Sequence, residues 1–590
     1  MASDNAKLKR IEIFPYFEGV NSLVSSTLFK KGELYHVENA RSTKIGYIEK
    51  RDGFRRLGNE IISLANYGIF FFENTTSTNT GFYRVSNISG TTSIYYLDSS
   101  SVWTALTGEG TGISAGTISI TNADRNLFFV NGVDENKYIQ SNGSTVVASG
   151  TSASSHTYGS PIAHIINYYK DRIYLGNYTV GSTNYKNGIL FSSRPLGIIS
   201  LVDGDHVAPV TSIKVTDTKY IRASDTLDIY RGGLSIGSVT VTAKTEDTLT
   251  VNSFGSDLDS ADELWVSGTY STGEKKFRWP DNPASGLDVK QYNTFKLTGS
   301  ANDSLTMMEN IGNVMIIANK TNMASWNDYN LQNFDIGIGC VSSRGYAKSM
   351  GVLWFIGYNG LYATTGGVPK LMSSKVQKYF DGATKSGIEA SAVGIKGLSV
   401  FCAIGNVTLY NDDGSTKKTI SNVVLEYEMR QENWYVHIGV DAKQFATYIS
   451  SSDPDRLQFI ASSGHVYEFL NGLDDDEAEI PFLVETPNLQ MSKNFESIIY
   501  PKAIIVEVVA GSDIQFFISL DDEMPYEIED SAKKGINILK INSRVEEEGA
   551  PRGNKIKIIM KEYSKRSCKV SRIALLYDDS IEEEEKRKHG

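Results

Sequence analysis

The sequence has few cysteines and no long apolar runs, and each shortage excludes a class of protein. Its three cysteines, Cys340, Cys402 and Cys568, lie far apart and match neither a disulfide framework nor a zinc-ligand spacing. We therefore expect buried thiols in a protein that is assembled in a reducing cytoplasm. No stretch approaches the roughly 18 apolar residues of a membrane-spanning helix. Residues 1–14 lack the apolar core of a signal peptide, so we expect no membrane span and no secretory signal.

Positive charge is also scarce. The chain has 58 Lys and Arg against 69 Asp and Glu, which gives a net charge of −11 and an isoelectric point near 5.4. Tight binding of nucleic acid needs a basic face that neutralises phosphates. We therefore expect no tight grip on a nucleic acid, although this composition is compatible with a duplex that slides past without being held.

Recognisable catalytic motifs are missing as well. The seven histidines are scattered and form neither an HExxH motif nor a His-x-His pair. The sequence GISAG (112–116) matches the Gly-x-Ser-x-Gly pattern, but a nucleophile elbow needs a strand before the serine and a helix after it. The flanks here are rich in Gly and Thr, which favours a loop. We expect no enzymatic activity, no catalytic residue, no cofactor and no metal site.

One acidic run leaves two interpretations open. Asp474, Asp475, Asp476 and Glu477, together with Glu479, supply oxygen ligands of the kind that hard cations prefer. The run lacks the alternating spacing of an EF-hand loop and its glycine at the sixth position. A solvated loop between two domains is the preferred interpretation.

The composition is rich in Tyr (32), Phe (25) and Gly (52), which is typical of strands and tight turns. The stretch GVLWFIGYNGLYATTGG (351–367) predicts a hairpin, because its glycines interrupt any helix and suit a turn between two apolar strands. Similar hairpins recur, and their apolar centres lie near residues 66, 128, 174, 316, 354, 402 and 459. Most intervals are about 40–60 residues, which is the range of four-stranded propeller blades.

The sequence thus predicts a mainly β protein with several domains. The long interval between 174 and 316 contains residues that alternate apolar and polar, with a Gly232-Gly233 turn, which predicts a small inserted β-barrel. Longer strands near 504–509, 514–520, 556–560 and 570–577 predict a separate sandwich-like domain. The expected organisation is an N-terminal arm at 1–58, a β-propeller at 59–205 and 285–475, a barrel at 210–270, a C-terminal β domain at 478–580 and a charged tail at 581–590.

Two parts of the sequence resemble a known family. The first 58 residues contain FEGVNS, then a Gly-Glu step and finally GYIEKRDGF, an order similar to the start of the tail nozzle (packaged-DNA-stabilisation) proteins of short-tailed bacteriophages. LEYEMRQENWYVHIG (425–439) and ISLDDEMPY (518–526) resemble the distal part of that family. The positions carried over are structural and have no catalytic meaning: Gly19, Asn21, Gly32, Arg51, Gly53 and Phe54.

The resemblance implies a role in the virion tail. It implies a homo-oligomeric, hexameric ring that docks through an adaptor to the portal, contacts tail fibre proteins and conducts the packaged genome. Double-stranded DNA would pass through without sequence-specific binding, after assembly of the protein in the cytoplasm of the host bacterium. Hairpin loops at one rim of the propeller are our hypothesis for the gate that retains the DNA.

Two other classes of function remain as alternatives. The first is a tail-tip or fibre adhesin that binds host-surface glycans, with exposed aromatic residues stacked on sugar rings. Trp103, Trp326 and Trp434 are candidates for such stacking, although burial in a core is the preferred interpretation for each. The second is a propeller enzyme that degrades polysaccharides, which is least favoured because no catalytic signature is present.

Overall fold

The computed structural model shows a chain that is almost entirely β-structure. It describes residues 9–578 except 15–16, 23–28, 31, 43–45, 60–64, 73–80, 89, 109–111, 124–125, 140–144, 149–161, 181–182, 193–198, 219–220, 222, 268–293, 298–302, 335, 411–415, 449–454, 492–498, 512 and 542–551. The predicted tail at 581–590 lies outside the described residues. The described helices are one turn each: η2 (Ser374–Val376), α1 (Gln377–Asp381) and α2 (Lys385–Glu389). The prediction of a mainly β protein is confirmed.

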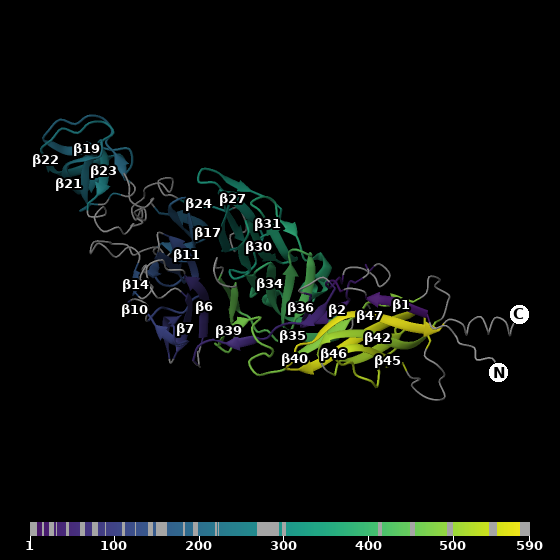
Figure 1. Cartoon of the computed structure of the whole chain (residues 1–590). Helices are drawn as coiled ribbons and strands as arrows, with labels where there is room; N and C mark the ends of the chain where they lie inside the picture. The colour runs from purple at the N-terminus through teal and green to yellow at the C-terminus, as the bar shows by residue number, and fades with distance from the viewer. Residues whose placement is uncertain are drawn as a thin grey trace, which may run out of the picture. The chain divides into compact units, whose positions relative to one another are not determined.

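The chain divides into two compact units. Unit 1 comprises Met1–Glu60, Arg344–Thr364 and Pro369–Gly590, and unit 2 comprises Ile61–Ser343 and Thr365–Val368. Within the described residues, seven sheets repeat one pattern, in which four antiparallel strands pair in an up-and-down order. This is the pattern of β-propeller blades. Figure 1 shows these sheets in colours that run from purple to green.

Unit 2 contains four of these sheets. Neighbouring sheets contact each other through their first strands, β11 with β15 and β15 with β25, and apolar clusters fill the space between them. The sheets are β6 (Ala65–Phe72), β7 (Gly81–Ile88), β8 (Thr91–Leu97) and β9 (Trp103–Ala105); β11 (Ser119–Ala123), β12 (Asn126–Val130), β13 (Lys137–Ile139) and β14 (Thr145–Ala148), joined by β10 (Thr107–Gly108); β15 (Ile162–Tyr169), β16 (Arg172–Val180), β17 (Thr183–Phe191) and β24 (Thr294–Lys296); and β25 (Leu305–Ile311), β26 (Val314–Asn319), β27 (Met323–Trp326) and β28 (Leu331–Asn333).

A small barrel interrupts the third of these sheets, between β17 and β24. Its strands are β18 (Ser200–Leu201), β19 (Val210–Lys214), β20 (Thr226–Arg231), β21 (Leu234–Lys244), β22 (Thr248–Phe254) and β23 (Glu263–Val266). They pair in the order β18-β23-β20-β21-β22-β19, and a bridge between Val202 and Val215 joins the two edges. Alternate residues such as Leu227 and Ile229 fill a core of the barrel's own. Period-two alternation therefore places one set of side chains inside and the other in water.

Unit 1 contains the other three blade-like sheets. They are β29 (Tyr346–Ser349), β30 (Val352–Gly357), β31 (Gly360–Thr364) and β32 (Lys370–Leu371); β33 (Ala392–Lys396), β34 (Ser399–Tyr410), β35 (Thr416–Glu428) and β36 (Asn433–His437); and β37 (Gln444–Tyr448), β38 (Arg456–Ile460) and β39 (Val466–Phe469) with β5 (Phe54–Arg56). The predicted hairpin at 351–367 is confirmed as β30 and β31, with Gly357 opposite Gly360. The outermost strand of the last sheet, β5, comes from the N-terminal segment.

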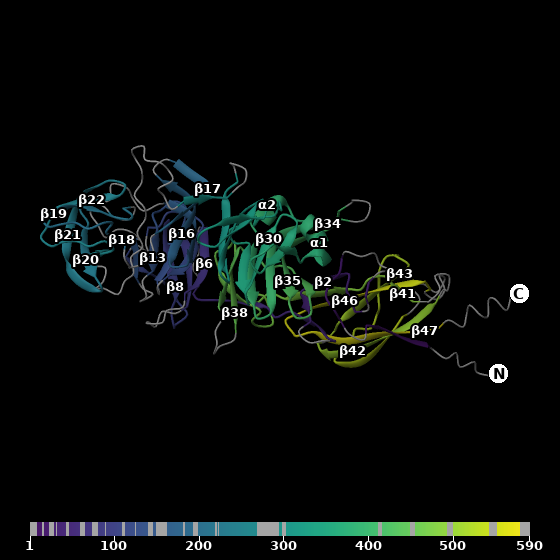
Figure 2. The ribbon, with the colours of Figure 1, turned by 90° about the horizontal axis from the view of Figure 1, so that it is seen from above.

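Two further sheets in unit 1 combine both ends of the chain, and Figure 2 shows them as two layers. One contains β1 (Lys9–Phe14), β3 (Ala40–Arg41), β4 (Ile48–Lys50), β47 (Lys569–Asp578), β42 (Tyr500–Ala510) and β45 (Gly535–Lys540). The other contains β2 (His36–Glu38), β40 (Ile480–Glu485), β46 (Lys555–Ser564), β43 (Gln515–Leu520), β44 (Tyr526–Glu527) and β41 (Leu489–Gln490). The described strands of the segment 1–58 therefore belong to these sheets and to the last blade, where β1, β2 and β5 pair with the distant strands β47, β40 and β39.

The three cysteines have the predicted environment. Cys340, Cys402 and Cys568 are free thiols and are at most 1% exposed, so the prediction of buried thiols is confirmed. Burial raises the pKa of Cys340 and of Cys568 to about 12. None of the helices in the described ranges has the length and apolar character needed to cross a bilayer.

Candidate functional site

The six positions taken from the family resemblance lie in unit 1, where the N-terminal segment passes between the last blades and the two C-terminal sheets. Gly19 packs against β36, and a Cβ atom there would lie 2.6 Å from the backbone nitrogen of Trp434. The next residue, Val20, donates its N–H to the Trp434 carbonyl at 2.8 Å. A side chain at position 19 would therefore push the segment away from the blade.

Asn21 and Gly32 hold a turn of the same segment. The Asn21 amide donates to both carboxylate oxygens of Glu33 at 3.0 Å, and Glu33 is only 2% exposed. Gly32 has φ +96°, a conformation that favours glycine, and its carbonyl accepts the N–H of Glu18. These contacts order the chain just before β2.

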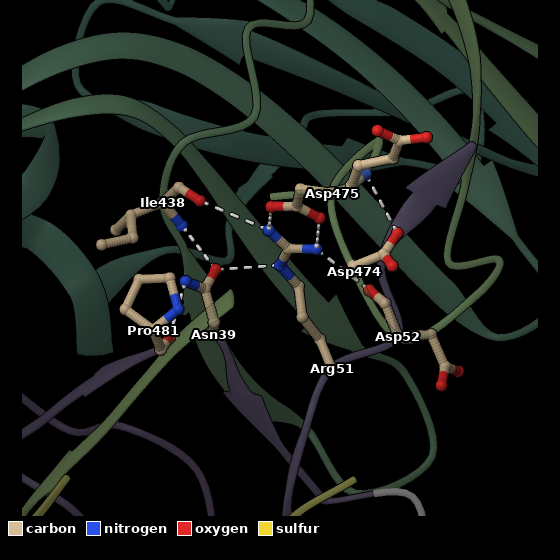
Figure 3. Close-up of polar contacts among 8 residues, drawn as sticks. Asn39, Arg51, Asp52, Ile438, Asp474, Asp475 and Pro481 are labelled. Atoms are coloured by element: carbon tan, nitrogen blue, oxygen red, sulfur yellow. Dashed lines mark hydrogen bonds and ion pairs between the residues drawn. The ribbon is translucent and has the colours of Figure 1, made fainter. Parts of the chain in front are cut away.

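Arg51 is the centre of a polar network (Figure 3). Its two terminal nitrogens donate to the two oxygens of Asp475 at 2.7 and 2.5 Å, and its Nε donates to the Asn39 side chain at 2.8 Å. Further bonds reach the carbonyls of Asp52 and Ile438. The guanidinium is fully buried and makes five hydrogen bonds, which is the number of N–H groups that it carries.

Asn39 extends this network to the C-terminal sheets. Its side chain accepts the N–H of Ile438 at 2.9 Å and donates to the carbonyl of Pro481 in β40 at 2.9 Å. Asn39 has φ +55°, a left-handed conformation that Asn tolerates better than most residues. Arg51 and Asn39 together therefore connect the loops after β36 and β39 to the first C-terminal strand.

Gly53 and Phe54 follow directly and begin the strand that completes the last blade. A Cβ atom on Gly53 would lie 1.7 Å from the carbonyl oxygen of Asp474, so only glycine fits between the two backbones. Phe54 packs edge-on against Phe459 and Tyr467, with ring centroids 5.3 and 4.9 Å apart. The fit of these two residues sets the position of β5.

The acidic run at 474–479 has a structural role in this network. Asp475 pairs with Arg51, and Asp476 forms an ion pair with Arg56 at 2.7 Å. Burial raises the pKa of Asp475, and the contact with Arg51 opposes this rise. Among the described residues, no group of three or more His, Cys, Asp or Glu side chains is arranged to hold a metal ion.

Other charged residues of the segment are also buried with distant partners. His36 contacts the Tyr379 hydroxyl at 2.5 Å and Glu38 at 2.9 Å, and Glu38 also pairs with Lys418. Lys50 forms a buried ion pair with Glu562. We refer to Glu33, His36, Glu38, Arg41, Lys50 and Arg51, with their partners, as the N-terminal clasp.

Arg41 contacts the most deeply buried carboxylate of the clasp. Its guanidinium donates to one oxygen of Glu426 at 2.7 Å, and the Nε2 atom of His437 contacts the other at 2.8 Å. Burial alone would raise the pKa of Glu426, but Arg41, His437 and Ser399 lower it to about 2. Burial lowers the pKa of His437, which therefore stays neutral at pH 7 and donates Nε2–H to the carboxylate.

Ser399, His437 and Glu426 are the residue types of a hydrolytic triad, but their arrangement is different. The Ser399 hydroxyl donates to Glu426 at 2.7 Å, whereas a nucleophile would contact the histidine. Glu426 and His437 are completely buried, so no substrate reaches them. This cluster stabilises the packing of the N-terminal segment on the blade.

The remaining candidates from the sequence have structural environments too. In GISAG, residues 112–116 form neither strand nor helix, and the N–H of Ser114 donates to Asp134, so the loop interpretation is confirmed. Trp103, Trp326 and Trp434 are 4%, 8% and 1% exposed, which confirms burial in the core for all three.

The partners in the clasp were the part that sequence reasoning missed. Glu426 and His437 were not singled out, although each interrupts an apolar stretch: Glu426 in VVLEYE and His437 in WYVHIG. A charged residue at a position that the alternation assigns to a core is a signal for a buried partner. Which residue supplies that partner is fixed only by the tertiary fold.

Comparisons with known proteins show only a distant likeness. Neither a protein-family model nor a curated protein matches this chain. Among solved structures it is similar to YCF48 from Cyanidioschyzon merolae (11% identity, 71% of this chain and 98% of that chain, TM-score 0.30). It is also similar to BamB from Moraxella catarrhalis (8%, 71% and 100%, TM-score 0.27) and to the computationally designed Ika8 protein (11%, 71% and 99%, TM-score 0.27). At these TM-scores the likeness adds nothing to the strand order, which by itself identifies propeller-type blades.

Proposed function

We propose that this chain is a structural virion protein that forms the tail nozzle of a short-tailed bacteriophage. In this role it assembles into a sixfold ring, docks through an adaptor to the portal, binds tail fibre proteins and conducts the genome during ejection. The observation that carries the proposal is the clasp: all six positions of the family resemblance lie in it or directly beside it. They support the packing of the chain rather than chemistry, as the resemblance implies.

The charge of the chain suits a conduit for DNA. The inserted barrel alone has eleven acidic and five basic residues between positions 200 and 266, within a chain of net charge −11. Surfaces of this sign repel phosphates, so a duplex moves past them without the counterion release that accompanies tight binding. Because of this repulsion, we expect the duplex to pass without sequence-specific contacts.

Hairpin turns at one rim are our candidates for the element that retains the DNA. In unit 2, the turns β15–β16 and β27–β28 lie together, since Lys170 donates to the carbonyl of Asn327 at 2.7 Å. Tyr329 in the second turn is 85% exposed, which leaves a large ring projecting from the rim. A gate of this kind opens by displacement of loops between two states.

The mass of the assembled particle tests the proposal. Native mass spectrometry of the full chain with its adaptor is expected to give a species that contains six copies of the 65.0-kDa chain. A chain that stays monomeric in the presence of adaptor contradicts the assembly, and a trimer points to a fibre instead.

One observation favours the adhesin as a second candidate. On the outer face of the barrel, Tyr230 and Trp265 are half-buried, with ring centroids 5.8 Å apart, and Asp228 and Glu263 pair with them across the strands. Aromatic rings beside carboxylates suit the apolar faces and hydroxyls of a neutral sugar. Micromolar binding on a glycan array that is lost in Trp265→Ala would support this candidate, and an array without any bound glycan would exclude it.

A further inference from the structure

The edge strand β45 exposes apolar side chains that a soluble monomer normally covers. It is the last strand of its sheet and pairs only with β42 among the described strands. Ile536 and Ile538 are 66% and 60% exposed, and the exposed lysines Lys534 and Lys540 lie beside them. An edge strand with exposed apolar residues is a template for association with another chain.

A second surface of the same unit has the complementary character. The turn between β43 and β44, residues 521–525, presents Met524 at 79% exposure directly after three acidic residues. The turn is held in place because Asp521 accepts the backbone N–H groups of Asn554 and Lys555 at 2.9 and 2.8 Å. Asp522 and Glu523 are exposed beside Met524.

We propose that these two surfaces bind each other between neighbouring copies of the chain. Met524 of one copy would pack on Ile536 and Ile538 of the next, while its acidic neighbours face the lysines. Apolar residues at the centre and opposite charges at the rim are the usual anatomy of a protein interface. The occupant is therefore a second copy, and the inference rests on the self-assembly in the proposed function.

The contact uses two different surfaces, so it joins copies head to tail. A heterologous contact of this kind leaves one free surface on each end of a pair and closes into a ring when the rotation permits. It also predicts that disabling either surface prevents ring closure. In a two-fold contact, both copies use the same surface, so a mixture of the two variants would not restore association.

Three variants of the full chain test this contact. The edge variant carries Ile536→Glu and Ile538→Glu, and the turn variant carries Met524→Lys and Glu523→Lys. The control, Leu234→Glu, places an acid at an apolar side chain in the barrel that is 75% exposed. Circular dichroism and thermal melting establish that each variant is folded, and mass photometry measures its assembly.

We expect the wild type and the control to form the same ring, and each interface variant alone to need at least about tenfold more protein to assemble. An equimolar mixture of the two interface variants should give one-to-one dimers, because one copy supplies an intact turn and the other an intact edge. Rings formed by either variant at the wild-type concentration overturn the inference and leave the proposed function standing. Loss of assembly without dimers in the mixture also overturns it, whereas a wild type that does not assemble even with its adaptor contradicts the proposed function itself.

Discussion

The N-terminal clasp and the inserted barrel are stabilised in opposite ways. The barrel buries a core of apolar side chains, and it keeps ion pairs in water, such as that of Lys214 and Asp203, which are 53% and 50% exposed. The clasp instead buries charged groups, as in the pair of Arg51 and Asp475, whose side chains are 0% and 11% exposed. The barrel is therefore stabilised by an alternation within one short stretch, whereas the clasp depends on partners from distant parts of the chain.

Substitution of Arg51 should cause the largest loss of stability. Arg51→Ala leaves Asp475 buried without its counter-ion, and breaking a buried ion pair in this way costs about 3–5 kcal/mol. Denaturant unfolding of the full chain measures this loss. The matched change in the barrel, Lys214→Ala, should leave the unfolding curve nearly unchanged, because the exposed pair is screened by water.

A double variant sharpens this comparison. Arg51→Met with Asp475→Leu removes both charges, so it should be more stable than Arg51→Ala alone. If Arg51→Ala and Lys214→Ala are equally stable, the clasp has no special role in the fold.

Substitution of Gly53 should cause the next largest loss of stability. Gly53→Ala forces a methyl group against the Asp474 carbonyl, which requires a backbone shift that costs about 1–3 kcal/mol. Gly255→Ala in the barrel is the control, because no atom lies within 4 Å of the added carbon. Melting temperatures of the two variants check the difference, and a Gly53→Ala protein that melts with the wild type would contradict the close approach.

Lowering the pH should reduce the free energy of unfolding by a smaller amount, which grows as the pH falls. The pKa of His437 is lowered by burial from 6.5, so below pH 6.5 the unfolded chain takes up a proton that the folded chain refuses, and stability falls. The pKa of Glu426, which is lowered from 4.5 to about 2, extends this loss between about pH 4.5 and 2.

Unfolding curves at pH 7.5, 6.0 and 5.0 measure this effect, and His437→Gln should show a shallower dependence on pH over that range. Equal slopes for His437→Gln and the wild type would show that His437 is not the group that titrates in this range.

The smallest effect is expected at the exposed rim. Tyr329→Ala removes a ring that is 85% exposed, and substitutions at such sites change stability by less than about 0.5 kcal/mol. If this residue belongs to the gate, the variant should release DNA from assembled particles sooner while its melting temperature is unchanged. Unchanged release would remove Tyr329 from the gate.

The sequence predicted the strands of the barrel but not the partners in the clasp, and the structure shows why. The alternation of Leu227 and Ile229 with polar neighbours is local, so the strands of the barrel were predictable. The same holds for the hairpin of β30 and β31, whose turn and apolar run lie within one short stretch. Such elements need no information from the rest of the chain.

The clasp could be predicted only in part. Family resemblance pointed to Arg51 and Gly53, but Asp475 lies 424 residues from Arg51, and sequence reasoning placed it in a solvated loop. Its partner is set by the pairing of β5 with β39, which no local pattern encodes. Buried charges are individually conspicuous in a sequence, but their pairing is a property of the tertiary fold.

The central claim is that this chain builds a passive conduit whose role is geometric. Electron cryo-microscopy of the full chain bound to its adaptor tests it most directly. We predict sixfold rings around an open channel, with the clasp ordered in every copy. Particles that remain single chains, or that assemble with threefold symmetry, would contradict the claim.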